Sequence, residues 1–224
     1  MPPIIDLHCD LLHYLAGKEG RSAYDEQSRC SIPQLLQGGV KTQVFAIYEK
    51  TQKGSVDSGA RQAAIYASLR KKHKDIFPSS IIPRWSCENA SIFCEEKESF
   101  PLLWQRVEKY AKELGKPLYI SLTWNEENRF GGGAQSKVGL KEEGKKLLQW
   151  MAEKNVSIDF SHASDWLIED ILQWIDKEKA AIVPIASHSN FRYIVPELRN
   201  LPDDLRCVLA EIKQRNATSS FRGV

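Results

Sequence analysis

Six apolar runs rich in isoleucine and valine recur along the chain, separated by stretches with apolar residues at three- and four-residue spacing. The runs are typical of strands buried on both faces, and the spacing between them is typical of amphipathic helices. The alternation predicts an α/β fold with a parallel sheet. The predicted strands cover residues 4–8, 40–48, 81–86, 118–123, 156–161 and 181–187, and the predicted helices cover residues 32–36, 58–73, 100–114, 141–153, 165–177 and 203–215.

This order of elements leaves two architectures, a doubly wound sheet and a TIM-type (β/α)8 barrel. No Gly-x-Gly-x-x-Gly sequence follows the first strand, which weakens the doubly wound, dinucleotide-binding alternative. Gly131, Gly132 and Gly133 follow the fourth strand without the Lys-Ser/Thr pair of a phosphate-binding loop. We expect these glycines to form a flexible loop beside an active site.

Three histidines close predicted strands in the same way. His8, His162 and His188 each end an apolar run, and the carboxyl ends of parallel strands meet at one end of a barrel. Asp10 lies two residues after His8, so in an extended strand both side chains project to one face, and Glu88 follows the third strand. Any one histidine alone would be interpreted as a hydrogen-bonded core imidazole. Together, the nitrogen and oxygen donors predict a zinc site in which one carboxylate bridges two ions.

The remaining histidines and the cysteines have simpler interpretations. His13 and His73 fall in helix or loop positions and are predicted to lie on the surface. The five cysteines lack zinc-knuckle spacing, so we expect reduced thiols. Cys9 is expected to pack in the core, on the opposite side of its strand from its neighbours.

The charge and hydropathy of the chain favour a small substrate. The formal net charge is +2, and basic residues are interspersed with acidic ones, so no nucleic-acid partner is expected. No segment approaches the roughly 18 apolar residues of a membrane span, and the N-terminus lacks a signal-peptide pattern. We therefore expect no membrane association and a cytoplasmic location.

Five motifs occur in a specific order across nearly the whole chain. They are His8-Cys9-Asp10, Ser86-Cys87-Glu88-Asn89-Ala90, Leu122 to Asn128, Ile158 to His162, and Ser187 to Asn190 followed by Arg199 to Asp204. In sequence and spacing this set resembles the membrane (renal) dipeptidase family of zinc metallopeptidases. The resemblance implies a (β/α)8 barrel that hydrolyses the peptide bond of dipeptides through a hydroxide held between two zinc ions.

The resemblance also implies a role for each predicted ligand. His8 and Asp10 would hold the first zinc, His162 and His188 would hold the second, and Glu88 would bridge them as the catalytic carboxylate.

Substrate contacts follow from the same resemblance. Arg199 would pair with the substrate carboxylate, a task suited to a bidentate guanidinium. Asn125 and Asn128 lie in the loop after the fourth strand and are expected to line the pocket. Many relatives have a histidine where this chain has Trp124, so a polar contact to the substrate is missing or supplied by another group.

The family continues into two more strands and an Asp-Phe-Asp-Gly motif that this sequence lacks. We therefore predict an incomplete TIM-type barrel over residues 1–212, with about six of the eight βα units, and a tail over residues 213–224 outside the family pattern. Self-association or a complementing C-terminal chain would complete an active dipeptidase. The alternatives are a catalytically inactive remnant and another metal-dependent hydrolase of the amidohydrolase type.

Overall fold

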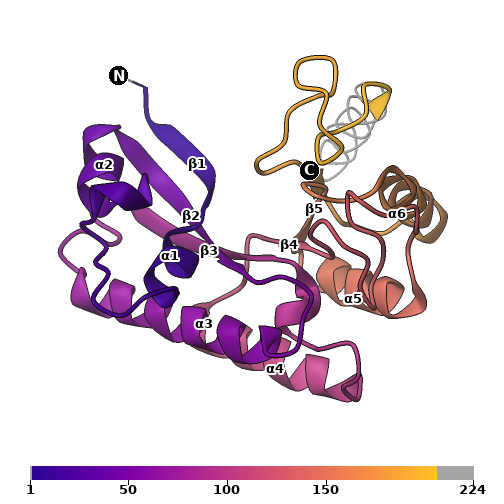
Figure 1. The fold of residues 1–224 in the computed structure, drawn as a ribbon, viewed down its shortest axis with the longest axis horizontal. Helices are drawn as coiled ribbons and strands as arrows, with labels where there is room; N and C mark the ends of the chain where they lie inside the picture. The colour runs from indigo at the N-terminus through magenta and orange to yellow at the C-terminus, as the bar shows by residue number, and fades with distance from the viewer. Residues whose placement is uncertain (1, 206–224) are drawn as a thin grey trace, which may run out of the picture.

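The computed structural model describes residues 2–205, in which six parallel strands form one sheet. Each strand pairs with the next one along the chain, so the strand order never reverses. The sheet curls into a half-barrel, as in part of a (β/α)8 barrel, and the doubly wound alternative is excluded (Figure 1). The strands are β1 (Ile4–Cys9), β2 (Val40–Tyr48), β3 (Ile82–Glu88), β4 (Tyr119–Ser121), β5 (Ser157–Asp159) and β6 (Pro184–Ile185).

Helices connect the strands, and their ends carry the expected signals. Ser31 and Gln34 form a capping box at the start of α2, and the Ser164 hydroxyl accepts a hydrogen bond from the Leu167 amide at the start of α6. Helix α4 ends at Gly115, which has a φ of 89°. The helices are α1 (Leu11–Ala16), α2 (Ile32–Gln37), α3 (Ser55–Lys72), α4 (Pro101–Leu114), α5 (Glu142–Glu153) and α6 (Asp165–Glu178), with 3-10 turns η1 (Glu26–Ser28) and η2 (Ala90–Ile92).

Five of the six predicted helices are confirmed, with small shifts at their ends. The helix expected over residues 203–215 lies largely outside the described residues, and the tail over residues 213–224 lies wholly outside them. Helix α1 was not predicted, because its six residues are too few to show a helical period.

The register of the sheet divides the side chains between two faces. Glu88 pairs with Tyr48 on one side and Ser121 on the other, so these three residues share the inner face of the half-barrel. Phe45 and Trp85, which pair with each other, point to the outer face and are buried beneath the helices. Burying one such aromatic side chain stabilises the fold by about 1.5–3 kcal/mol.

The inner face differs between its two ends. At the amino ends of the strands Ile5, Ile82 and Val183 are 65%, 45% and 51% exposed. Ile5 and Ile82 both pair with Thr42, which confirms that they share one row. At the carboxyl ends the inner face is polar and largely buried, as described below.

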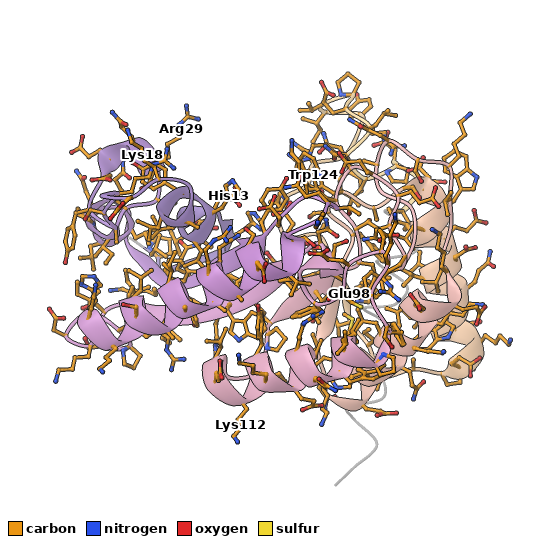
Figure 2. The ribbon with its side chains drawn as sticks, turned by 60° about the horizontal axis from the view of Figure 1, so that its bottom comes forward. His13, Lys18, Arg29, Glu98, Lys112 and Trp124 are labelled. Carbon is orange, nitrogen blue, oxygen red and sulfur yellow. The ribbon has the colours of Figure 1, made fainter. Side chains whose placement is uncertain are left out.

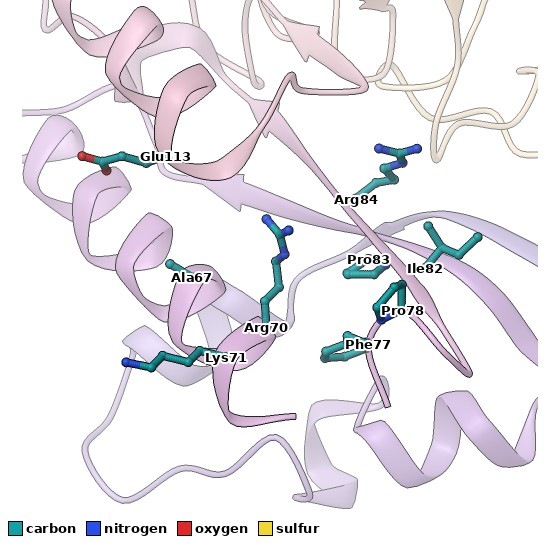
Figure 3. A pocket seen from close by; sticks show the side chains of 9 residues that line it. All are labelled: Ala67, Arg70, Lys71, Phe77, Pro78, Ile82, Pro83, Arg84 and Glu113. Atoms are coloured by element: carbon teal, nitrogen blue, oxygen red, sulfur yellow. The ribbon is translucent and has the colours of Figure 1, made fainter. Parts of the chain in front are cut away.

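A cavity of about 520 Å³ opens at the amino end of β3, and its charged side chains are Arg70, Lys71, Arg84 and Glu113 (Figure 3). Three cations and one carboxylate do not form a cation site. The cavity also lies at the opposite end of β3 from Glu88, so it is separate from the predicted metal ligands.

Residues 2–205 can also be compared with the expectations about the cysteines and about membrane-spanning segments. The four described cysteines form no disulfide, and Cys9 is buried in the core as predicted. No helix in this part of the chain combines the length and apolar character needed to cross a bilayer.

Candidate metal centre

The carboxylate of Glu88, at the end of β3, is the point on which three imidazoles converge. Its side chain is almost completely buried. The Nε2 atom of His8 lies 3.2 Å from Oε2, and the Nε2 atoms of His162 and His188 lie 3.4 and 3.5 Å from Oε1. Ligand atoms of His8, Glu88 and His188 also lie within 4.8 Å of one another. Four residues far apart in the sequence therefore meet at the carboxyl end of the sheet, as predicted.

These separations fit a bound metal ion. Two ligands that are each about 2.1 Å from a tetrahedral zinc ion lie about 3.4 Å from each other. Nitrogen and oxygen donors of this kind suit zinc. The rings of His8 and His188 are stacked, with their centroids 3.7 Å apart, and the Nε2 atoms of both face Glu88.

Local backbone geometry aims two of the imidazoles. Between Asp6 and Cys9 the pairing of β1 with β2 shifts, so that Leu7 and His8 oppose the single residue Val44. Such a β-bulge re-aims a side chain and is frequent beside active sites. His162 follows β5 with a φ of 66°, a left-handed conformation that non-glycine residues adopt mainly where the surroundings enforce it.

Asp10 is close to the site, but the reason given for its position is wrong. Strand β1 ends at Cys9, and Asp10 occupies the N-cap of α1 with φ −93° and ψ 25°, which is not extended backbone. Asp10 Oδ1 still lies 3.5 Å from His8 Nε2, and its side chain is 60% exposed. The turn into α1, rather than strand periodicity, brings the carboxylate back toward His8.

Burial and neighbouring charges have opposite effects on the pKa values of the site residues. Burial alone would lower the pKa of His8, but the carboxylates of Asp10 and Glu88 outweigh it and raise that pKa from 6.5 to about 10. Burial alone would raise the pKa of Glu88, but His188 and His8 outweigh it and hold that pKa well below its ordinary value. For His162 burial prevails over the attraction of Glu88 and lowers the pKa to about 3.

These shifts predict that the metal-free protein is most stable near pH 6.5. His8 stabilises the fold below its unfolded pKa of 6.5, and this contribution is lost as the pH rises toward 10. His162, whose folded pKa is depressed, stabilises the fold above 6.5, and this contribution is lost as the pH falls toward 3. Urea midpoints measured across this range in a chelator should fall on both sides. The variant His8→Gln should lack the His8 part of the alkaline decline, and an unchanged alkaline limb would contradict the assignment.

Comparison with known proteins agrees with this geometry. The family model described as membrane dipeptidase (peptidase family M19) matches residues 108–218. Residues 108–218, about half of the chain, are therefore those of a membrane dipeptidase family member. The match contains His162, His188 and Arg199, whereas His8, Asp10 and Glu88 precede it, so the structure is what unites the two groups.

The same relationship appears in two solved structures. A metallo peptidase from Rhodobacter sphaeroides, liganded with a phosphinate mimic of the dipeptide L-Ala-D-Ala, superposes with a TM-score of 0.68 at 17% identity. The alignment covers 93% of this chain and 71% of that one. The dipeptidase AC of family M19 gives a TM-score of 0.66 at 17% identity, over 93% of this chain and 69% of that chain. These likenesses confirm the fold of the membrane dipeptidase family.

A curated relative is also similar in sequence. An uncharacterized protein in the PQQ-III 3' region of Acinetobacter calcoaceticus is 34% identical over 106 residues. The alignment covers 42% of this chain and 31% of the relative. The chain therefore matches about a third of that relative's length.

The three residues predicted to contact substrate have different surroundings. Arg199 donates from Nη2 to the His188 carbonyl at 3.0 Å, and its buried Nε has no partner among residues 2–205. Asn125 Oδ1 lies 2.7 Å from His162 Nδ1, so Asn125 contacts a predicted ligand, and substrate binding by Asn125 stays a prediction. Asn128 does not line a pocket, because it is buried and its amide is bonded to Asn89 and to backbone groups.

Trp124, which is labelled in Figure 2, lies on the loop after β4. Its ring belongs to a row of rings beside the histidines. The ring centroids of His13 and Tyr48 are 5.2 Å apart, those of Tyr48 and Trp124 are 5.4 Å apart, and those of Trp124 and His162 are 5.6 Å apart. His13 is thus half-buried against Tyr48 rather than free on the surface. Trp124 and Tyr48 therefore form an aromatic wall beside His162.

The triglycine segment is tightly packed, which corrects the expectation of a flexible loop. A Cβ atom on Gly132 would collide with the Val138 carbonyl, and one on Gly133 would collide with backbone atoms of Trp124, Asn125 and Glu126. The glycines permit close backbone approach, not movement. The loop is also joined to the site, because the Ala134 amide donates to the His162 carbonyl at 2.8 Å.

The polar groups on the inner face behind the histidines were not predicted from the sequence. Tyr119, Asp159 and Ser187 are all bonded into the site, as described below. A signal was present for Asp159, because a carboxylate within the apolar run of residues 156–160 must have partners when it is buried. Tyr119 gave no signal, since its partner is 111 residues away.

Proposed function

We propose that this chain forms the metal-binding part of a dipeptidase that hydrolyses the peptide bond of dipeptides at a site for two zinc ions. The observation that carries the proposal is that the two oxygens of the Glu88 carboxylate face different histidines. Oε2 faces His8 and Oε1 faces His162 and His188, as expected of a carboxylate that bridges two cations. Asp10 adjoins His8 and would complete the ligands of the first ion.

The residues of the chain prepare this site for hydrolysis at neutral pH. When bound, zinc lowers the pKa of water and polarises the carbonyl under attack. Glu88 stays ionised, because its pKa lies well below the ordinary value, and His162 stays neutral, so both present lone pairs. The rings of Trp124 and Tyr48 stand beside His162 and would limit the access of water from that side.

Arg199 supports a substrate with a free carboxylate. Its guanidinium adjoins the site, since it bonds the His188 carbonyl and its charge helps to lower the pKa of His162. Its unpartnered Nε is a donor for which residues 2–205 supply no acceptor. The Rhodobacter sphaeroides structure holds a mimic of L-Ala-D-Ala, and we extend that class of substrate to this chain as part of the proposal.

Further polypeptide is proposed to cover the inner face before the site becomes active. Within residues 2–205, β1 and β6 are the two edges of the sheet, and Ile5, Ile82 and Val183 are exposed between them. Two more parallel strands would close the barrel and bury this row. A complementing chain or a second copy would make the specific activity rise with protein concentration.

Zinc analysis combined with dipeptide hydrolysis tests the proposed function. The zinc-loaded protein should release alanine from L-Ala-L-Ala or L-Ala-D-Ala, and a chelator should abolish the release. His188→Gln should lose both zinc and turnover, whereas His73→Gln, which alters a histidine packed on Tyr24, should retain both. If the wild-type chain retains no zinc and cleaves no dipeptide, an inactive remnant would be favoured. Turnover of cyclic amides but not dipeptides would favour an amidohydrolase.

A further inference from the structure

Each imidazole at the proposed zinc site has a polar side chain behind its other ring nitrogen. The Nδ1 atom of His8 lies 2.9 Å from the Tyr119 hydroxyl, that of His162 lies 2.7 Å from Asn125 Oδ1, and that of His188 lies 2.7 Å from Ser187 Oγ. All three Nε2 atoms are thereby left facing Glu88. The repeated arrangement comes from three different elements of the fold.

The direction of the Tyr119 bond is fixed by a second contact. Tyr119 stands on β4, is fully buried, and reaches across the inner face to β1. Its single hydroxyl proton is donated to the Leu7 carbonyl at 3.0 Å. The oxygen can then only accept from His8, so the Nδ1 atom of His8 carries a proton. Nε2 is therefore the nitrogen that gives up its proton when a metal ion binds.

Asp159, a buried carboxylate on β5, fixes the direction of the hydrogen bond between Ser187 and His188 in the same way. Ser187 Oγ donates to Asp159 Oδ2 at 2.7 Å, which leaves its lone pairs for the Nδ1 proton of His188. Asp159 also accepts from the Ser121 hydroxyl at 2.9 Å and from the Ser161 hydroxyl at 3.0 Å. The amides of Ser161 and Ser187 donate to it as well. Every contact made by Asp159 thus requires it to be an acceptor.

We propose that Tyr119 and the Asp159–Ser187 pair are positioning residues that set the tautomers of His8 and His188, so that Nε2 is the metal-binding nitrogen of both. This inference rests on the proposed zinc site. None of the three groups reaches the Glu88 carboxylate in the contacts described, so they act through the imidazoles. Such partners raise metal affinity by orienting the ring and fixing its proton.

Tyr119→Phe tests the β1 side of the site with little change in volume. We expect the affinity for Co²⁺ at pH 7 to fall by about 10- to 100-fold. Long-range ¹H–¹⁵N spectra of the Zn²⁺-loaded protein should lose the hydrogen-bonded Nδ1 proton of His8 and keep that of His162. The matched control is Tyr110→Phe on α4. Tyr110 is also buried, against Trp85 and Phe93, and this variant should bind Co²⁺ as the wild type does.

Asp159→Asn and two Ser187 variants test the β6 side. An asparagine NH₂ group facing Ser187 could not accept the Ser187 proton, so Ser187 would donate to His188 instead. The Nε2-protonated tautomer should then appear at His188, and Co²⁺ affinity should fall. Ser187→Ala should also lose affinity, whereas Ser187→Thr, which keeps the hydroxyl, should restore most of it. If Asp159→Asn does not fold, the comparison of Ser187→Ala with Ser187→Thr decides the question.

The outcomes separate this inference from the proposed function. Wild-type affinity in both Tyr119→Phe and Ser187→Ala, or an equal loss in Tyr110→Phe, would overturn the positioning roles. If the wild-type chain binds Co²⁺ but cleaves no dipeptide, the proposed function fails and the positioning roles are still measured. If it binds no metal ion, ¹⁵N shifts of His188 in the metal-free protein still decide which nitrogen carries the proton.

Discussion

Glu88→Gln is expected to remove metal binding almost completely, with a loss of affinity of more than about 100-fold, because it eliminates the one charge that all three imidazoles face. Glutamine has the same shape, but it is neutral, and its NH₂ group would point at a nitrogen that must offer a lone pair. Removing one member of a buried, paired set of charges costs about 3–5 kcal/mol. Both oxygens of Glu88 face imidazoles, so we expect both ions of the proposed zinc site to be lost together.

Metal content and calorimetric titration with Zn²⁺ check this result. The control is Glu98→Gln, which neutralises a partly exposed carboxylate paired with Arg106. That variant should keep its metal affinity, although it loses a bidentate ion pair. Two zinc ions bound per chain in Glu88→Gln would show that Glu88 does not bridge them.

Gly133→Ala is expected to have the largest effect on folding among single methyl additions in the loop after β4. The new Cβ would overlap backbone atoms of Trp124, Asn125 and Glu126, none of which can rotate away as a side chain could. Overpacking of this kind costs about 1–3 kcal/mol, and we expect the upper end of that range. Because Asn125 bonds His162, displacement of this backbone should also weaken metal binding.

Urea unfolding of the metal-free protein measures the first effect, and Co²⁺ affinity measures the second. Gly17→Ala is the matched control, since its Cβ would approach most closely the far end of the long Arg21 side chain, and Gly17 has an ordinary φ of −75°. We expect it to change the free energy of unfolding by less than about 1 kcal/mol. Equal stability of Gly133→Ala and the wild type would mean that the loop is flexible after all.

The strands and most helices were predictable because burial on both faces of the sheet leaves long apolar runs in the sequence. The strands β4, β5 and β6 are shorter than predicted, because residues such as Thr123 and Ser161 leave the ladder to enter loops at the carboxyl end. The convergence of the histidines was predictable for a similar reason, since parallel strands deliver their ends to one place.

Other features depend on contacts that local sequence does not encode. Asp10 was placed near His8 by strand periodicity, whereas a turn into α1 performs that task. The triglycine segment suggested flexibility, because composition does not show which backbone atoms approach a glycine. Tyr119 reaches β1 across the inner face, and no spacing rule connects residues 111 positions apart.

The bulge at Leu7 and His8 affects how this strand tolerates insertions and deletions during evolution. Loss of one residue elsewhere in β1 would send every following side chain to the opposite face. Loss of Leu7 alone would restore regular pairing and leave Cys9 opposite Phe45, with His8 opposite Val44. His8 would then still face the inner side of the sheet, but the Leu7 carbonyl that accepts the Tyr119 proton would be gone, so the residue inserted at the bulge is what links β1 to β4 behind the imidazole.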